Sequence, residues 1–273
     1  MGLAVITLHV VVLALVQGIT EFLPISSSGH LALVPMLTDW PDQGLTMDVA
    51  VHVGTLLAVI LYFWRDVATM LAGTRRFWRV RSDPGARMIW HLVVATIPVV
   101  VAGVMLKDRI ATDLRTLEVI AWATLGFGLL LGIADKVSLT VRRVEHMRFL
   151  DALVLGLAQT LALIPGTSRS GITMTAARFL GFERPDAARF SMLMSIPTIT
   201  AAGVLLGMDL YRLDDWRVTQ DALVAGALAL VSALVAMAAL MAWLRRAGFM
   251  PFVIYRVVLG LALLGIVYGY IDI

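Results

Sequence analysis

The chain contains eight strongly apolar segments, and this pattern constrains its fold more than any other feature. Apolar runs of roughly 17–25 residues are long enough to cross a bilayer as a helix. With 60% hydrophobic residues and a mean hydropathy of +0.89, the chain of 273 residues is too apolar for an ordinary soluble domain. The apolar segments are 2–20, 46–63, 89–106, 117–133, 150–164, 187–207, 221–243 and 252–271. We therefore predict an all-α, polytopic membrane bundle.

Two of these segments, the first and the fifth, lead into polar stretches where a membrane helix would otherwise continue. These stretches are "QGITEFLPISSSGH" (17–30) and "PGTSRSG" (165–171), and each is followed by a short apolar stretch, 31–37 or 172–181. Broken backbone at membrane depth is tolerated only where protein buries it or a water-filled cavity reaches it. We therefore expect two re-entrant helical hairpins and six true spans.

The positions of lysine and arginine predict the orientation of these spans. Loop 64–88 holds six basic residues and loop 134–149 holds four, whereas loop 38–45, on the other side, holds none. Six spans and two re-entrant hairpins place all the basic-rich loops on one side, which the positive-inside rule makes cytoplasmic. Both termini are then outside. The first helix lacks a basic n-region and a small-residue cleavage site, so we expect it to be retained rather than removed as a signal peptide.

Composition and charge narrow the classes of function. The chain has no cysteine, so disulfides, thiolate chemistry and cysteine-bound metals are excluded. A net charge of +3 is too small to indicate nucleic-acid binding. Glu21, Arg169 and Arg256 fall inside otherwise apolar segments, and such ionisable residues usually mark a functional site. A purely structural Glu21–Arg ion pair would explain the charges, but it would leave the neighbouring serines and histidine without a role.

An internal repeat relates the two polar stretches. A shift of 142 residues superimposes "LALVQGITEFLPISSSG" (13–29) on "LGLAQTLALIPGTSRSG" (155–171). The residues that match in type are Gln17 with Gln159, Ser26 with Ser168, Ser28 with Ser170 and Gly29 with Gly171. Within one membrane domain (1–273), each half, about 1–140 and 141–273, then has one hairpin and three spans. Because three is odd, the repeats are predicted to be inverted, as in many transporters, with their hairpin tips meeting near the midplane.

The two tips together would suit an oxyanion such as phosphate. Free backbone N–H groups and the helix dipole favour an anion at the start of a helix, and Arg169 adds a planar fork that matches phosphate oxygens. Arg256 is a further candidate from the last span. Serines at a helix start are also good N-caps, but capping does not explain an arginine between them. The residues that the tips contribute are Glu21, Ser26, Ser27, Ser28, His30, Thr167, Ser168, Arg169 and Ser170.

These groups also suit phosphoryl chemistry. Ser27 is our first candidate nucleophile, with His30 or Glu21 as its general base; alternatively, His30 attacks phosphorus directly. Glu21 and Gln17, one helical turn apart, are candidates to hold a divalent cation, Mg²⁺ or Ca²⁺. The other four histidines are interpreted as structural: His9, His52, His91 and His146. His52 is the one to re-examine, because "DVAVHVGT" (48–55) is expected in a neighbouring span.

Both polar stretches resemble the two signature motifs of the undecaprenyl-diphosphate phosphatase family, bacterial membrane enzymes linked to bacitracin resistance. The resemblance extends over essentially the whole chain, including "DVAVHVGTLLAVILYFW" (48–64) and "FVIYRVVLG" (252–260). It implies hydrolysis of undecaprenyl diphosphate to the monophosphate carrier used in cell-wall synthesis. It also implies a location in the bacterial inner membrane, a divalent-cation requirement and a site that opens to the periplasm.

The resemblance also assigns residues by position. It makes Gln17 and Glu21 the E/Q-x-x-x-E pair of the first motif, and Gln at position 17 leaves Glu21 as the main anionic ligand. The other motif residues are Ser26, Ser27, His30, Gly166, Thr167, Ser168, Arg169, Ser170 and Gly171.

A transporter or flippase for a lipid phosphate is the competing hypothesis, because it uses the same inverted repeat and the same anion-binding charges. A carrier needs no nucleophile and base, so the Ser27–His30 pair favours hydrolysis. The expected partners are the lipid substrate and membrane lipids. The sequence leaves the oligomeric state open, with a homodimer as one option.

Overall fold

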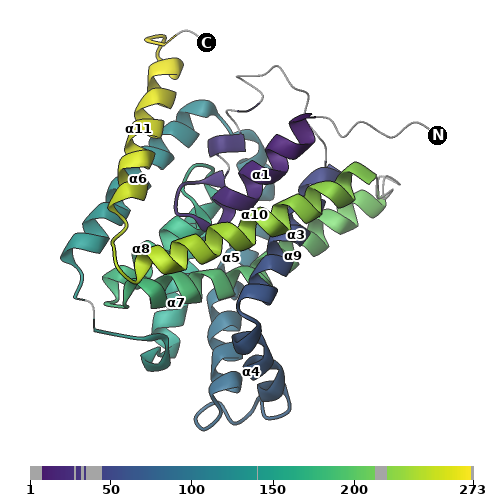
Figure 1. Ribbon diagram of the computed structural model, residues 1–273, viewed down its shortest axis with the longest axis vertical. Coiled ribbons are helices and arrows are strands. Elements are labelled where there is room, and N and C mark those ends of the chain that lie inside the picture. Colours follow the sequence, from purple (N-terminus) through teal and green to yellow (C-terminus); the bar gives the residue numbers. More distant parts are fainter. Residues whose placement is uncertain are drawn as a thin grey trace.

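The computed structural model describes residues 8–27, 29–31, 34, 45–139, 141–212 and 220–271. Its helices are α1 (Leu8–Phe22), α3 (Leu45–Tyr62), α4 (Trp64–Thr74), α5 (Pro84–Thr112), α6 (Leu117–Val137), α7 (Phe149–Thr160), α8 (Arg169–Phe179), α9 (Arg184–Arg212), α10 (Gln220–Leu244) and α11 (Met250–Val267), with short 3₁₀ turns η1 (Val144–His146) and η2 (Leu161–Leu163) (Figure 1). In this part of the chain the sole β-type pairing is an isolated bridge between Arg142 and Phe182. The prediction of an all-α fold is confirmed.

The described helices fit a membrane bundle. Five of them are long and apolar enough to cross a membrane, and the number is six if α3 and α4 count as one bent span. All six coincide with the segments predicted as spans. α1 and α7 are shorter apolar helices, as expected for arms of re-entrant hairpins, and α8 forms where 172–181 predicted a short helix. The other short helix, expected at 31–37, lies almost entirely outside the described residues.

α4 is a helix where the sequence predicted only a loop, 64–88. The chain bends by 84° between α3 and α4. Trp64 and Leu71 on α4 are exposed, whereas Gly73 packs so closely against the start of α5 that an added Cβ would lie 2.5 Å from the Ala86 nitrogen. Because α4 is amphipathic and short, its polar residues hide it from an analysis based on average hydropathy.

The two halves of the chain interlock rather than fold side by side. Under the predicted repeat, α1 corresponds to α7, α3 to α9, α5 to α10 and α6 to α11. α1 packs on α10 while α7 packs on α5, and α3 and α6 pack on their own counterparts. This exchange of partners is compatible with the predicted repeat, although α3 also packs extensively on α10, and the inverted topology stays a prediction. The main core draws on both halves, with Phe22 and Leu131 from the first and Met174, Phe190 and Met237 from the second.

A buried ion-pair cluster joins α6, α8 and the loop before α11. Asp135 accepts hydrogen bonds from the Arg178 Nε at 3.2 Å, the Arg184 Nε at 2.7 Å and the Phe249 backbone nitrogen at 3.1 Å. Arg178 is fully buried. Burial of charge in this protein therefore extends beyond Glu21, Arg169 and Arg256, the charged residues that the sequence placed inside apolar segments. Tertiary packing buries charges that lie at segment ends in the sequence.

Removing the carboxylate of this cluster should weaken the fold. Asp135→Ala leaves the fully buried Arg178 without its counter-charge, so we expect a loss of about 3–5 kcal/mol in unfolding free energy, measured by denaturant titration in detergent. Arg143→Gln is the control, since the Arg143–Glu183 pair is solvent-exposed and should be worth less than about 1 kcal/mol. Equal effects of the two substitutions would contradict a stabilising role for the cluster.

Candidate active site

Two serines at equivalent positions of the repeat shape the two broken helices. Ser26 and Ser168 have φ angles of 73° and 70°, and among the described residues they are the only ones other than glycine with positive φ. Each serine hydroxyl accepts a hydrogen bond from a backbone nitrogen three residues later, that of Gly29 at 3.3 Å or Gly171 at 3.1 Å. Both serines thus cap the short helical segments that follow them. Their predicted role in binding phosphate stays a prediction.

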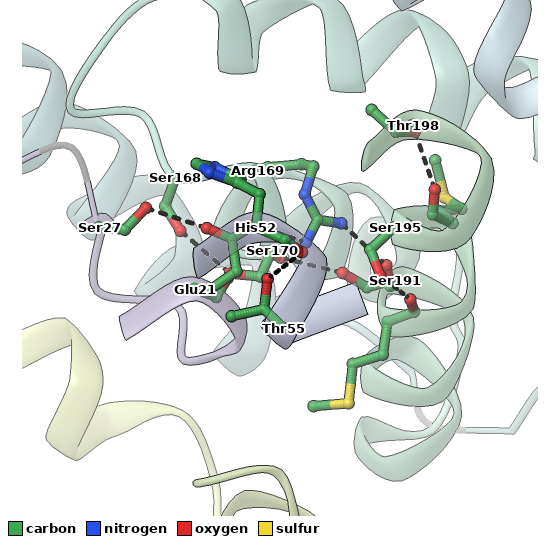
Figure 2. Close-up of polar contacts among 12 residues, drawn as sticks. Glu21, Ser27, His52, Thr55, Ser168, Arg169, Ser170, Ser191, Ser195 and Thr198 are labelled. Carbon is green, nitrogen blue, oxygen red and sulfur yellow. Dashed lines mark hydrogen bonds and ion pairs between the residues drawn. The ribbon is translucent and has the colours of Figure 1, made fainter. Parts of the chain in front are cut away.

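Glu21, near the end of α1, is the centre of the polar cluster (Figure 2). Its Oε2 accepts hydrogen bonds from the Gln17 side-chain amide at 3.0 Å and from the Ser27 hydroxyl at 3.3 Å. Its Oε1 lies 3.2 Å from the Nη2 of Arg169. The two charged side chains are only 10% and 13% exposed, so the structure joins the two predicted motifs through one largely buried ion pair.

Arg169 is the first residue of α8 and is held from three directions. Besides Glu21, it donates from Nη1 to the Ser191 carbonyl of α9 at 3.3 Å. Its guanidinium carbon lies 6.0 Å from the ring centroid of Phe22, within the range of a cation–π interaction. These contacts fix the direction of the guanidinium at the start of α8, where the helix dipole also favours an anion.

Gln17 connects Glu21 to a histidine that the sequence analysis treated as structural. The Gln17 Nε2 lies 3.4 Å from the Nε2 of His52, on α3. The His52 Nδ1 donates to the Asp48 carbonyl at 2.7 Å, so the His52 Nε2 is the acceptor of the Gln17 amide hydrogen. With both amide hydrogens directed at Glu21 and His52, the Gln17 Oε1 is buried without a hydrogen-bond partner.

Ser27 and His30, the predicted nucleophile and base, point to different partners. Ser27 donates to Glu21. His30 donates from Nδ1 to the Ser26 carbonyl at 2.7 Å, and its Nε2 meets the hydroxyl of Tyr255, on α11. Among the described contacts none joins His30 to Ser27 or Glu21. The group placed to accept the Ser27 proton is therefore Glu21, and the catalytic role of His30 stays a prediction.

The second motif binds to the first through backbone carbonyls. The Ser170 hydroxyl donates to the carbonyls of Glu21 at 3.3 Å and Leu23 at 3.0 Å. Gly166 has a φ of 94°, and an added Cβ would lie 2.4 Å from the Ile120 carbonyl oxygen. Glycine is therefore required there both for conformation and for the close approach to α6. The Thr167 side chain is fully buried, and its hydroxyl has no partner.

Arg256, on α11, contacts the backbone of this second motif and is fully buried. It donates to four backbone carbonyls, those of Ala123, Thr124, Gly166 and Thr167, at 3.0–3.4 Å. Its Nη1 has no partner, and an added Cβ on Gly171 would lie 2.7 Å from it. Arg256 thus ties α11 and α6 to the loop before α8, while its predicted contact with phosphate stays a prediction.

Three residues of this cluster were not predicted from the sequence as members of the site: His52, Ser191 and Tyr255. Position 52 carried a partial signal, a histidine in an apolar span. Ser191 contributes a backbone carbonyl to Arg169, and Tyr255 contacts His30 across 225 positions of sequence. Neither contact has a sequence signature, because it depends on which helices pack together.

The residues present fit a hard divalent cation in part. Glu21 supplies a carboxylate, and the unpartnered Gln17 Oε1 is a neutral oxygen one helical turn earlier on α1. These are ligand types that Mg²⁺ and Ca²⁺ prefer. Within the described ranges no group of three or more His, Cys, Asp or Glu side chains converges as a complete metal site. A cation here would therefore complete its coordination with phosphate oxygens and water.

Fold and site together define a helical membrane protein whose polar centre is built from two interrupted helices. The family model described as bacitracin resistance protein BacA matches residues 10–262. The chain belongs to this family.

Three curated relatives carry the same activity in their names. Undecaprenyl-diphosphatase 1 of Rhodospirillum rubrum is 55% identical, with 96% of this chain and 95% of the relative covered. The undecaprenyl-diphosphatase of Ruegeria pomeroyi is 56% identical, with 96% and 98% covered. That of Hahella chejuensis is 51% identical, with 94% and 97% covered.

Replacing Arg256 should destabilise the protein as a whole. Arg256→Met leaves four buried carbonyls without their shared donor, so we expect a loss of about 3 kcal/mol or more in unfolding free energy. Denaturant titration in detergent measures this loss. Arg246→Met, at an exposed position, is the control and should change stability by less than about 0.5 kcal/mol. A fully stable Arg256→Met protein would show that the loop before α8 is held by other contacts.

Proposed function

We propose that this protein hydrolyses undecaprenyl diphosphate to undecaprenyl phosphate and inorganic phosphate, which recycles the lipid carrier for cell-wall synthesis and confers resistance to bacitracin. Family membership and the names of the relatives support this activity. The observation that carries it is the contact between Glu21 and Arg169, which brings a carboxylate, a guanidinium and a serine hydroxyl together.

Ser27 attacks the terminal phosphorus in this proposal. Its hydroxyl proton passes to the carboxylate of Glu21, which already accepts its hydrogen bond. The bond between the terminal phosphorus and the bridging oxygen breaks, and undecaprenyl phosphate leaves. Water then attacks the phosphoserine and releases inorganic phosphate. His30 is the second candidate for both roles, and its bond to Tyr255 must open before it can act.

Arg169 stabilises the charge that develops in the transition state. Its guanidinium is already oriented by the Ser191 carbonyl and by Phe22, so little reorganisation is needed during the reaction. The first-turn amides of α8 add further donors for phosphate, within the predicted binding set of Gly166, Thr167, Ser168, Ser170 and Gly171. A cation held by Glu21 and Gln17 would neutralise phosphate oxygens.

We further propose a location in the bacterial inner membrane, with the site open to the periplasm and both termini outside. α4 and the arginine-rich segment after it project at one end of the molecule, whereas the end of α11 lies at the opposite end (Figure 1). This separation, together with the positive-inside rule, supports the proposed orientation. The proposed orientation also fits the inverted repeat, which remains a proposal. A homodimer is compatible with this orientation.

The relatives' names favour hydrolysis over the lipid-phosphate transporter or flippase, and one assay separates the two. In detergent no compartments exist, so a carrier produces no signal. We expect the purified protein to release inorganic phosphate from undecaprenyl diphosphate, and Ser27→Ala, Glu21→Gln and Arg169→Ala each to lower kcat at least about a thousandfold. Each variant should still fold and insert, although Glu21→Gln and Arg169→Ala remove one partner of a buried ion pair and should be less stable than wild type.

Ser232→Ala is the matched control, because Ser232 lies outside the candidate active site and its hydroxyl donates only to backbone carbonyls of its own helix, α10. Full activity of Ser27→Ala would move the nucleophile to another residue, and full activity of Arg169→Ala would remove its proposed role in the transition state.

The cation site gives a separate prediction. A chelator should abolish phosphate release, and added Mg²⁺ or Ca²⁺ should restore it. Gln17→Glu adds a second carboxylate, so it should lower the dissociation constant for Mn²⁺, measured by calorimetry without substrate, about tenfold. Unchanged activity in the presence of chelator would overturn the cation requirement.

A further inference from the structure

An apolar hollow of about 260 Å³ lies between α3 and α9. Val49, Val53 and Leu56 line it from α3, and Ile199 and Val204 from α9. Val53 and Val204 are 46% and 58% exposed, so the hollow opens on the outer surface of the bundle, where acyl chains would surround it.

Two polar side chains line the hollow, His52 and Thr200. The Thr200 hydroxyl donates within its own helix to the Ile196 carbonyl at 2.6 Å, whereas His52 leads to the candidate active site. His52 lies in the wall of the hollow and is hydrogen-bonded through Gln17 to Glu21. Figure 2 shows His52 beside Glu21 and Arg169. The hollow is therefore continuous, through one histidine, with the cluster that would hold the diphosphate.

The hollow also lies on the side of the membrane from which the substrate is expected. Its residues belong to the first part of α3 and the second part of α9. Both parts are remote from α4 and from the arginine-rich segment that follows α4. Under the proposed orientation, the hollow faces the outer leaflet.

We propose that this hollow binds the first isoprene units of the prenyl chain while the diphosphate lies at Glu21 and Arg169, an inference that rests on the proposed function. An undecaprenyl chain has eleven isoprene units, far too many for a space of about 260 Å³, so the remainder of the chain stays in the lipid. His52 lies between the space for the prenyl chain and the space for the diphosphate. Its ring would contact the apolar chain, while its Nε2 accepts the hydrogen bond from Gln17.

A second apolar groove offers a competing place for the chain. It is lined by residues of α1, α10 and α11, including Ile19, Ala239 and Phe252. Its polar side chain, Ser232, donates within its own helix to the Leu228 and Ala229 carbonyls. Its lining does not include Gln17, Glu21, His52 or Arg169. Leu23 lines it and accepts a hydrogen bond from Ser170, but through its backbone carbonyl, so no side chain of this groove is hydrogen-bonded toward Glu21 as His52 is in the α3–α9 hollow.

Gly203 provides a direct test, because it lines the hollow and no heavy atom lies within 4 Å of an added Cβ. Gly203→Phe should fill the hollow without disturbing the backbone. We expect kcat/KM for farnesyl diphosphate and undecaprenyl diphosphate to fall about tenfold or more, since burial of several methylenes is lost. Inorganic diphosphate, a competitor without a chain, should keep its inhibition constant within about twofold.

Two matched variants control for the added ring. Gly126→Phe places the same side chain at an exposed position of α6 that also has open space around it, and it should behave as wild type. Ala239→Phe fills part of the competing groove and should also leave the kinetics unchanged. Selective loss in Ala239→Phe, or wild-type kinetics in Gly203→Phe, would overturn the proposal.

Photolabelling of the wild-type protein gives an answer that does not depend on how any variant folds. A farnesyl diphosphate analogue with a photoreactive chain should label peptides of α3 and α9, and labelling confined to α10 and α11 would overturn the proposal. A wild-type protein that releases no phosphate from any prenyl diphosphate would instead contradict the proposed function.

Discussion

The ion pair between Glu21 and Arg169 is the interaction on which the site depends. Two charges that are each about nine-tenths buried are stable in a membrane protein only when they neutralise each other and their remaining hydrogen-bonding groups find partners. Gln17 and Ser27 supply those partners for Glu21, and the Ser191 carbonyl supplies one for Arg169. Since the two charged residues come from different halves of the chain, the pair exists only when both broken helices are in place.

The surrounding structure keeps those breaks in position. Ser26 and Ser168 adopt the same unusual backbone conformation and cap the segments after them, while Arg256 occupies carbonyls that the loop before α8 leaves unpaired. The buried Arg256 is thus a support for backbone that no regular helix satisfies. The two arginines differ in their surroundings: Arg169 faces the cluster around Glu21, and Arg256 holds the loop before α8.

Much of this arrangement was predictable from the sequence, because hydropathy, proline and glycine, and charge at membrane depth are local signals. The spans and the two polar breaks follow from them, and the meeting of Glu21 with Arg169 follows from the internal repeat. Contacts that depend on helix packing were not predictable. His52 looked like an ordinary helix histidine, Tyr255 gave no signal of its contact with His30, and the buried Asp135–Arg178 pair lies at segment ends. α4 was missed because its amphipathic pattern averages to low hydropathy.

The central claim can be tested by cross-linking in a chain that has no cysteine of its own. Glu21→Cys with Arg169→Cys introduces two thiols at the junction of the halves, and a short bis-maleimide should join them in membranes. After proteolysis within the exposed segment 75–82, the two fragments should remain linked on a denaturing gel, whereas those of Glu21→Cys with Arg143→Cys should separate. Separation of the fragments in the Glu21–Arg169 variant would show that the two broken helices do not meet, and the active site described above would not form.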